Sequence, residues 1–424
     1  MNYKVKNVYG KTNGNKITVS VPGSKSITAR AMLIAAIANG ESTLYGVPDF
    51  GDCVAFLGCL NELDLKWQRD GNNLKITGCG GKLAKKRVPM YVGNAVEDRK
   101  AELNDSLIDV KSAGTAARFI PAFLAFQKGE YALTCSEQMK KRPVKPLIDT
   151  LTALGAKFVF YENENSYPFT IYGTPDPANE AEVDVTESSQ FLSALLISAV
   201  CAGKPLKITA RGNHGMDYVK MTVNMMRSFG ASVSENNGVF TVSGGYTARD
   251  YKIEPDLSAA SYFYAMNKIL GTNVTVAGVT ANSVQGDYKF IERLQNFDGG
   301  EIDMGEFSDQ ALTLAAIAPY LKEPTEIRGV AHIRRQECDR ISAIVQNLTN
   351  MGVECKEFED GVKIYPSQPK AAKIKTFGDH RVAMSFALTG LRAEGIVIEN
   401  CEVCEKTFAN YFEILEDLTA KLTQ

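Results

Sequence analysis

The sequence has few of the residues that build metal centres and disulfide frameworks. Only three histidines occur in 424 residues, and no two of them lie close together, so a histidine-based metal site is not expected. Nine cysteines are scattered along the chain, which favours reduced thiols in the core over a disulfide framework. Cys401 and Cys404 have metal-like spacing but no second pair, and we interpret them as strand-end packing. We therefore expect no metal and no cofactor.

The chain also lacks an excess of one charge and a long apolar run. Lys and Arg number 47 against 49 Asp and Glu, which argues against a broad nucleic-acid or anionic membrane surface. No apolar run approaches the roughly 18 residues of a membrane span, and residues 1–16 contain no apolar signal segment. We expect a cytoplasmic protein without nucleic-acid or membrane partners, in which any anion site is local.

Several common catalytic motifs are missing. Gly23 to Ser26 resembles a phosphate loop, but that loop needs a glycine directly before its lysine, and Ser24 separates Gly23 from Lys25. No GxGxxG fingerprint follows a strand, and no nucleophile elbow is present. These absences argue against nucleotide binding and against serine hydrolase chemistry.

The stretch VPGSKSITAR, residues 21–30, places two cations at the predicted start of an alanine-rich helix. A helix N-terminus carries partial positive charge and free N–H groups, and its usual companions are Asp and Glu. Lys25 and Arg30 therefore oppose the helix dipole unless an anion arrives from solution. The stretch predicts an anion-binding site.

A polar cap, an alanine-rich helix, a glycine-containing turn and a β-branched strand recur six times along the chain. The six copies begin at Ser24, Ala113, Ser188, Ser258, Ser308 and Gly378. Between them recurs a helix that ends near glycine and enters a hairpin, with turn signals at Asn237-Gly238 and Asp360-Gly361. Because a chain of this length with 45% apolar residues can bury two cores, we predict an α/β (α+β) protein of two domains with three copies each.

Polar residues gather at the starts of these helices and in four other segments. The four segments are 140–145, 332–340, 377–384 and 404–412. Taken singly, each has an ordinary alternative: a solvated basic loop, surface ion pairs with Glu337 and Asp339 in a first helical turn, a structural His380, or a loop lysine at 406. If the six helices point their N-termini at one region, their summed dipoles would make that region an anion site.

Ten collinear segments over essentially the full chain resemble the enolpyruvyl transferase family. They are PGSKSITAR, SAGTAAR, KRPVKPLID, SSQFLSALL, the Tyr218 segment before MTVNMMRSFG, EPDLSAASYF, SDQALT, RRQECDR, GDHRVAM and KTFANYF. PGSKS in particular resembles the 5-enolpyruvylshikimate-3-phosphate synthases. Two alternatives stay open: the related UDP-N-acetylglucosamine enolpyruvyl transferases, and a non-catalytic phosphometabolite-binding relative on the same fold.

The resemblance implies a two-domain inside-out α/β barrel. The first domain would comprise residues 1–22 and 254–424, the second residues 23–253, with the active site in the cleft between them. The implied reaction transfers the enolpyruvyl group of phosphoenolpyruvate to the 5-hydroxyl of shikimate 3-phosphate and releases phosphate, a step of the shikimate pathway toward chorismate and the aromatic amino acids. A monomer is expected. Both substrates are polyanions, which would account for the cations at the first helix.

The resemblance also assigns residues to the two substrates. It implies that shikimate 3-phosphate is held by Lys25, Ser26, Arg30, Ser188, Ser189, Gln190, Tyr218, Asp309 and Gln336. It implies that phosphoenolpyruvate, and the inhibitor glyphosate in its place, is held by Lys25, Gly114, Thr115, Arg142, Gln190, Arg340, Arg381 and Lys406.

Three residues are implied to be catalytic, namely Asp309, Glu337 and Lys25. Asp309 and Glu337 match the base and the acid that addition and elimination require. Gln336, His332 and Gly215 depart from the family pattern, where Lys, Asn and Ser are common, and these departures bear on substrate affinity.

Overall fold

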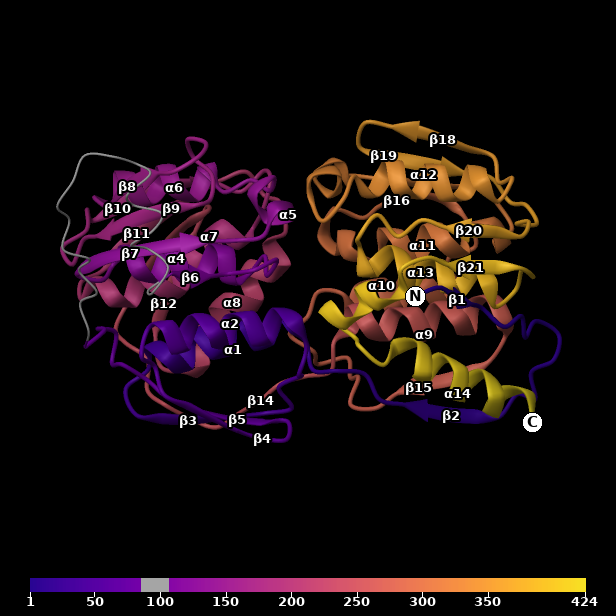
Figure 1. Cartoon of the computed structure of the whole chain (residues 1–424), viewed down its shortest axis with the longest axis horizontal. Coiled ribbons are helices and arrows are strands. Elements are labelled where there is room, and N and C mark those ends of the chain that lie inside the picture. The colour runs from indigo at the N-terminus through magenta and orange to yellow at the C-terminus, as the bar shows by residue number, and fades with distance from the viewer. Residues whose placement is uncertain (85–106) are drawn as a thin grey trace. The chain divides into compact units, whose positions relative to one another are not determined.

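The chain crosses between two structural units at Pro22 and again at Ile253. The computed structural model describes residues 1–84 and 107–424. Unit 1 comprises Met1–Pro22 and Glu254–Gln424, and unit 2 comprises Gly23–Ile253 (Figure 1). The N-terminal strands of the chain therefore belong to the same unit as its C-terminal half.

Unit 2 contains three four-stranded sheets with one shared pairing pattern. The sheets are β14(Tyr251–Lys252)-β3(Glu41–Tyr45)-β5(Asn73–Thr77)-β4(Trp67–Asp70), β6(Ile108–Asp109)-β7(Gly129–Thr134)-β9(Phe169–Gly173)-β8(Lys157–Phe160) and β10(Glu180–Asp184)-β11(Leu206–Arg211)-β13(Val239–Ser243)-β12(Ser232–Asn236). In each sheet the first pair is parallel and the next two pairs are antiparallel. This repetition is the structural counterpart of the repeat in the sequence.

Unit 1 repeats the pattern once in full and adds two smaller sheets. The full copy is β16(Gly300–Asp303)-β17(Thr325–Arg328)-β19(Gly361–Ile364)-β18(Cys355–Phe358), and the smaller sheets are β1(Tyr3–Lys4)-β21(Ile396–Ile398)-β20(Ala372–Ile374) and β15(Asn273–Val276)-β2(Lys16–Val19). Strand β1 pairs antiparallel with β21, and β2 pairs parallel with β15. Both N-terminal strands thus complete sheets whose other strands come from the segment Glu254–Gln424.

The six alanine-rich segments form the interior helices of the two units, as predicted. They are α1(Lys25–Ile37), α4(Ala116–Ala125) and α7(Gln190–Ala199) in unit 2, and α9(Leu257–Leu270), α11(Ala311–Ile317) and α13(His380–Gly390) in unit 1. Every residue of α4, α11 and α13 is buried. A helix that is apolar on all faces is stable only when it is enclosed, which accounts for the position of these helices inside the sheets (Figure 1).

The remaining helices lie outside this set. In unit 2 they are α2(Gly51–Glu62), α5(Glu137–Lys140), α6(Lys145–Ala153) and α8(Met216–Ser228), and in unit 1 they are α10(Tyr288–Asn296), α12(Arg340–Asn350) and α14(Tyr411–Thr423). Short 3-10 turns are η2(Val200–Ala202), η3(Gly305–Gln310), η4(Ala318–Tyr320), η5(Ala331–Arg335) and η6(Cys401–Lys406). The helices α2, α6, α8 and α12 each lead into a hairpin, as the second recurring segment predicts.

Several helix starts differ from the prediction, as three examples show. Helix α9 is capped by Asp256, whose carboxylate accepts from Ala259 N at 3.0 Å, rather than beginning at Ser258. Ser308 lies in the turn η3, and α11 begins three residues later. Asp339 is the cap of α12 rather than a first-turn acid, and Glu337 precedes the helix. Capping side chains compete locally for free N–H groups, so helix starts are harder to predict than helices themselves.

Both predicted hairpins are present. Asn237 and Gly238 have φ of +50° and +77° and join β12 to β13 as a two-residue turn that needs left-handed backbone. In the second hairpin Phe358 pairs with Gly361, so the turn lies one residue earlier than the Asp-Gly pair. An added Cβ at Gly361 would lie 1.8 Å from Ile327 O, and the close approach of β17 therefore requires this glycine.

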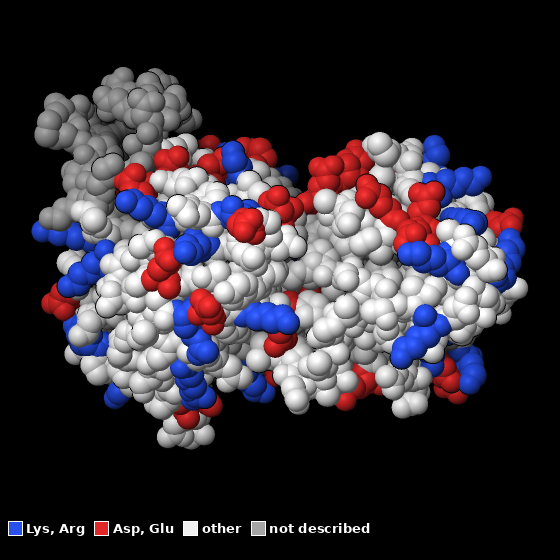
Figure 2. Space-filling view, turned by 90° about the horizontal axis from the view of Figure 1, so that it is seen from below, with Lys and Arg blue, Asp and Glu red and all other residues white. Residues whose placement is uncertain are grey.

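Charged side chains of both signs are interspersed on one face of the molecule. Figure 2 shows one face on which Lys and Arg alternate with Asp and Glu, in keeping with the near-neutral composition. Among the described residues, no helix combines the length and the apolar character that crossing a membrane requires. All nine cysteines are free thiols, including Cys401 and Cys404, which are buried in η6.

Candidate active site

The cation at the start of α1 already has a partner within unit 2. Lys25 Nζ lies 3.3 Å from Asp52 Oδ2 of α2, and the Asp52 side chain is 6% exposed. The sequence indicated that an anion from solution must neutralise this helix start, whereas Asp52 supplies part of that charge. Ser24 caps the helix, since its hydroxyl accepts from Ile27 N. Lys25 is therefore held in place before any ligand binds.

Arg30 lies deeper than its neighbours in the motif and is 1% exposed. It donates from Nε to Thr222 Oγ1 at 2.7 Å, and from Nη1 to Ser26 O at 2.9 Å. Its Nη2 group donates to Ser193 Oγ at 3.2 Å and Tyr218 O at 3.4 Å. Burial lowers the pKa of Arg30 to about 10. These bonds tie the start of α1 to α7 and α8.

The start of α7 and the start of α8 meet at Ser189 and Gly215. Gly215 has φ of +62°, and an added Cβ would lie 2.6 Å from Ser189 Oγ. This departure from the family pattern therefore has a local reason, because a serine would clash with Ser189 and would strain the left-handed backbone. Ser188 Oγ accepts from Gln190 N at 3.2 Å, and Tyr218 lies in the first turn of α8.

Gly114 and Arg142 lie in direct contact, although they belong to different segments. An added Cβ at Gly114 would lie 2.7 Å from Arg142 Nη1. Thr115 follows Gly114 and is 4% exposed, and its hydroxyl has no hydrogen-bond partner among the described residues. The guanidinium, the backbone of Gly114 and the Thr115 side chain thus lie at the start of α4.

In unit 1, Asp309 lies between two arginines. Arg381 Nη2 donates to Asp309 Oδ2 at 2.8 Å, and Arg340 Nη1 donates to Oδ1 at 3.2 Å. Arg340 also donates from Nε to Asp379 Oδ2 at 2.7 Å, and it hydrogen-bonds Gln336 Oε1. Asp379 in turn caps α13 by accepting from Arg381 N at 2.8 Å. The carboxylates of Asp309 and Asp379 therefore orient Arg340, and Asp309 also orients Arg381.

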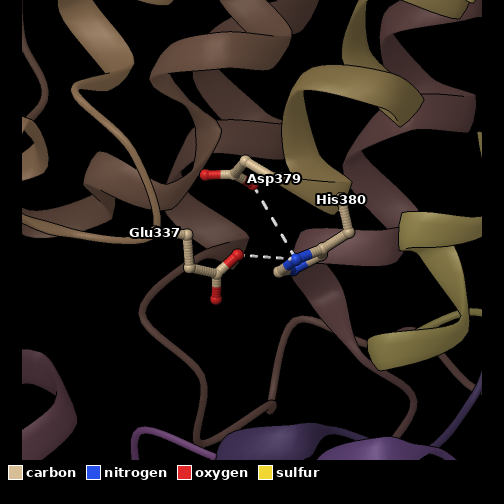
Figure 3. Close-up of side chains that lie close together, drawn as sticks. All are labelled: Glu337, Asp379 and His380. Atoms are coloured by element: carbon tan, nitrogen blue, oxygen red, sulfur yellow. Dashed lines mark ion pairs between the residues drawn. The ribbon is translucent and has the colours of Figure 1, made fainter. Parts of the chain in front are cut away.

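Glu337 lies next to this cluster and has its own cationic partners. Lys406 Nζ donates to Oε1 at 2.8 Å, and His380 Nδ1 lies 2.8 Å from Oε2 (Figure 3). Burial acts to raise the pKa of Glu337, but the positive charges of His380, Lys406 and Arg340 hold this pKa well below its ordinary value. Glu337 is therefore ionised at neutral pH in the protein without substrate.

One group of side chains in the described residues has the spacing of a metal site. The ligand atoms of Glu337, Asp379 and His380 all lie within 4.8 Å of one another (Figure 3). However, the two carboxylates already form ion pairs with Arg340 and Lys406. Because these cations would repel a divalent ion, the group is suited to orient and exchange protons rather than to hold a metal.

The predicted site residues are divided between the two units, and within each unit the structure brings some of them into contact. The first set, in unit 2, comprises Lys25, Ser26, Arg30, Gly114, Thr115, Arg142, Ser188, Ser189, Gln190 and Tyr218. The second set, in unit 1, comprises Asp309, Gln336, Glu337, Arg340, Arg381 and Lys406. The sequence did not assign Asp52, Asp379 or His380 to the site. A polar Asp-His-Arg run at a helix start was the signal for the last two, whereas Asp52 had none.

The chain matches a family model described as EPSP synthase (3-phosphoshikimate 1-carboxyvinyltransferase) over residues 11–98 and 97–415. The chain belongs to the EPSP synthase family. A 3-phosphoshikimate 1-carboxyvinyltransferase of Trichormus variabilis is 38% identical over 420 residues, which cover 93% of this chain and 94% of that protein. The 3-phosphoshikimate 1-carboxyvinyltransferase 2 of Halalkalibacterium halodurans is 34% identical over 430 residues, with 95% and 91% covered.

Solved structures support the same fold. An EPSP synthase from Acinetobacter baumannii aligns with a TM-score of 0.79 over 98% of each chain at 21% identity. The enolpyruvyl transferase NikO from Streptomyces tendae aligns with a TM-score of 0.71 over 98% of this chain and 96% of that chain, at 15% identity. The predicted α/β fold built from repeats is therefore confirmed, and the EPSP synthase family is the branch that the sequence matches.

Proposed function

We propose that this chain is a 3-phosphoshikimate 1-carboxyvinyltransferase. It transfers the enolpyruvyl group of phosphoenolpyruvate to the 5-hydroxyl of shikimate 3-phosphate. One observation within the fold carries the proposal: two carboxylates are each fixed by cationic groups. Asp309 pairs with Arg340 and Arg381 at the starts of α12 and α13. Glu337 pairs with Lys406 at the end of η6. Such an arrangement provides a base and an acid beside groups that bind phosphate and carboxylate. The EPSP synthase relatives support this substrate pair over a UDP-sugar.

The reaction consists of an addition step followed by an elimination step, and both steps require proton transfer. In the addition step the 5-hydroxyl oxygen forms a bond to C2 of phosphoenolpyruvate, the hydroxyl proton leaves to a base, and C3 receives a proton to become a methyl group. In the elimination step C3 loses a proton to a base, the double bond between C2 and C3 forms again, and the bond from C2 to the phosphate oxygen breaks, which releases phosphate. We assign the base to Asp309 and the acid at C3 to Glu337, with Lys25 as a further proton-transfer group.

Substrate binding would change the protonation of Glu337. Its pKa is low because His380, Lys406 and Arg340 surround it with positive charge. The carboxylate and phosphate of phosphoenolpyruvate, bound by Arg340 and Lys406, would neutralise part of that charge. Because the pKa of an acid rises when neighbouring cations are neutralised, substrate binding would prepare Glu337 to hold the proton that it donates.

The other residues of the two sets are assigned to substrate binding. The assignment gives the phosphate and hydroxyls of shikimate 3-phosphate to Lys25, Ser26, Arg30, Ser188, Ser189, Gln190 and Tyr218, with Asp309 and Gln336. It gives phosphoenolpyruvate to Lys25, Gly114, Thr115, Arg142 and Gln190, with Arg340, Arg381 and Lys406. The buried bonds of Arg30 also fix the backbone of Ser26 and Tyr218. We propose that both units contribute to one reaction and that the enzyme works as a monomer.

Phosphate release from phosphoenolpyruvate tests the function. Shikimate 3-phosphate and UDP-N-acetylglucosamine are offered in separate reactions, with Asp309→Asn as the inactive control. We expect phosphate release in the reaction with shikimate 3-phosphate and none in the reaction with the UDP-sugar. The opposite result, release only in the reaction with the UDP-sugar, would instead identify a UDP-N-acetylglucosamine enolpyruvyl transferase. Calorimetric binding of shikimate 3-phosphate without any turnover would identify a non-catalytic relative.

A further inference from the structure

Arg118 is a buried cation in unit 2 that neither the sequence nor the family resemblance assigned to the site. It lies in the first turn of α4, four residues after Gly114, and is 2% exposed. Its Nη1 group donates to Gly114 O at 3.2 Å and contacts Met139 Sδ at 3.1 Å. Its Nη2 group donates to Pro143 O at 2.6 Å. One guanidinium therefore joins two segments that are distant in the sequence.

Both segments carry residues proposed to bind phosphoenolpyruvate. Gly114 directly precedes Thr115, and Pro143 directly follows Arg142. The two segments approach each other closely: an added Cβ at Gly114 would lie 2.7 Å from Arg142 Nη1 and 3.2 Å from Nη2. The two hydrogen bonds from Arg118 act between the backbones of these segments. They therefore fix the separation of Gly114 and Arg142 through the backbone.

The charge of Arg118 points to the same site. Its oxygen acceptors are backbone carbonyls, and its Nε has no hydrogen-bond partner among the described residues. Burial lowers the pKa of Arg118 to about 9, and the nearby charge of Arg142 contributes to the lowering. A buried cation whose neighbours are another cation and neutral groups is stabilised when an anion arrives nearby. An anion bound by Arg142 would have this effect.

We infer that Arg118 is a positioning residue for phosphoenolpyruvate: it holds the Gly114 and Arg142 segments at the separation that the substrate requires, without contacting the substrate. This inference rests on the proposed function. A planar guanidinium can donate to two carbonyls at fixed angles, whereas a lysine ammonium is a single point on a flexible chain. Arg118→Lys therefore retains the charge and loses the two-point geometry.

The test compares Arg118→Lys and Arg118→Met with wild type. We expect the KM for phosphoenolpyruvate to rise by about 10-fold in Arg118→Lys and about 30-fold in Arg118→Met, as for the loss of one or two buried hydrogen bonds. The dissociation constant of shikimate 3-phosphate, measured alone by calorimetry, should change by less than about 3-fold. Arg227→Met is the matched control. Arg227 lies on α8 of the same unit and also donates two hydrogen bonds to a backbone carbonyl, Val233 O, at 3.2 and 2.7 Å.

The outcomes separate this inference from the proposed function. Equal losses for both substrates would show a general structural role and would overturn the inference, as would an unchanged KM for phosphoenolpyruvate. If Arg118→Met does not fold, Arg118→Lys decides by the same criteria. If wild type itself releases no phosphate, the proposed function fails. The positioning role is then tested by whether Arg118→Lys weakens calorimetric binding of phosphoenolpyruvate in the presence of shikimate 3-phosphate.

Discussion

Arg340 and Asp379 form a buried ion pair in which Nε lies 2.7 Å from Oδ2, with side chains 3% and 0% exposed. Arg340 starts α12 and Asp379 caps α13, so the pair joins two helix starts that both carry proposed site residues. Burial alone would lower the pKa of Arg340, but Asp379, Glu337 and Asp309 raise it above its ordinary value. The guanidinium is therefore a permanent cation, and its orientation depends on Asp379.

Replacing Asp379 with Asn should destabilise the protein by about 3 kcal/mol, because it leaves Arg340 with one buried carboxylate fewer. The amide oxygen can still cap α13, so the substitution tests the loss of the negative charge without the loss of the cap. Urea unfolding at pH 7 measures the change. Asp298→Asn is the control, since Asp298 pairs with Lys268 and Lys322 at the surface, and it should have little effect. Equal destabilisation by the two variants would contradict the role of the buried pair.

Glu337 should make stability depend on pH in the acid range. Its pKa in the folded protein lies well below the ordinary 4.5, so its ionised form stabilises the fold above about pH 4.5, and this stabilisation is lost as the pH falls toward the folded-state pKa. Glu337→Gln should therefore unfold more readily than wild type at pH 7, and the difference should shrink below pH 4.5. Urea midpoints measured from pH 7 to pH 3 check this. A constant difference over that range would contradict the shift.

Arg142→Ala should weaken phosphoenolpyruvate far more than shikimate 3-phosphate, by roughly 2 to 5 kcal/mol if the charge pair becomes buried when substrate binds. Initial rates over both substrate concentrations give the two KM values. Lys145→Ala is a suitable control, because Lys145 is a nearby cation that pairs with Asp149 at the surface. The assignment of Arg142 fails if both substrates lose affinity equally.

Gly114→Ala should relieve inhibition by glyphosate if glyphosate binds at the phosphoenolpyruvate position, as the family resemblance implies. The new methyl group would lie 2.7 Å from Arg142 Nη1, so we expect it to displace the guanidinium as well as to narrow the site. Both ligands should bind more weakly, and glyphosate should be affected more. Inhibition curves at several phosphoenolpyruvate concentrations test this, with Gly58→Ala on α2, where an added Cβ meets nothing within 4 Å, as control. Identical responses of wild type and Gly114→Ala would argue against the placement.

The parts of the fold that are predictable from sequence are those set by local pattern. Alanine-rich runs between a polar cap and a glycine turn mark α1, α4 and α7, because a helix with this composition must be enclosed. The pairing of β1 with β21 is not predictable in this way, since it joins the two ends of the chain. Helix starts are intermediate in predictability. Asp256, for example, caps α9 two residues before the predicted start.

The site residues also differ in how far they could be predicted from the sequence. Lys25 and Arg381 could be found because cations at helix starts are unusual. Their ion pairs with Asp52 and Asp309 could not be predicted, because these carboxylates come from other segments. Arg118 was missed for a different reason: an arginine in an apolar helix has no local signal for the two backbone segments that it joins. Gly215 looked like a weakened contact in sequence, whereas the structure shows that Ser189 excludes a side chain there.

The division of unit 1 between the two ends of the chain has a consequence for biosynthesis. Residues 1–22 are translated before unit 2, but the strands that pair with β1 and β2 are β21 and β15, which are translated after the whole of unit 2. Unit 2 is continuous and can complete its three sheets during translation. Until β15 and β21 are translated, the backbone edges of β1 and β2 have no partner in unit 1 and are open to chaperones or to association with other chains. The last unit to be finished is therefore the one that holds Asp309 and Glu337.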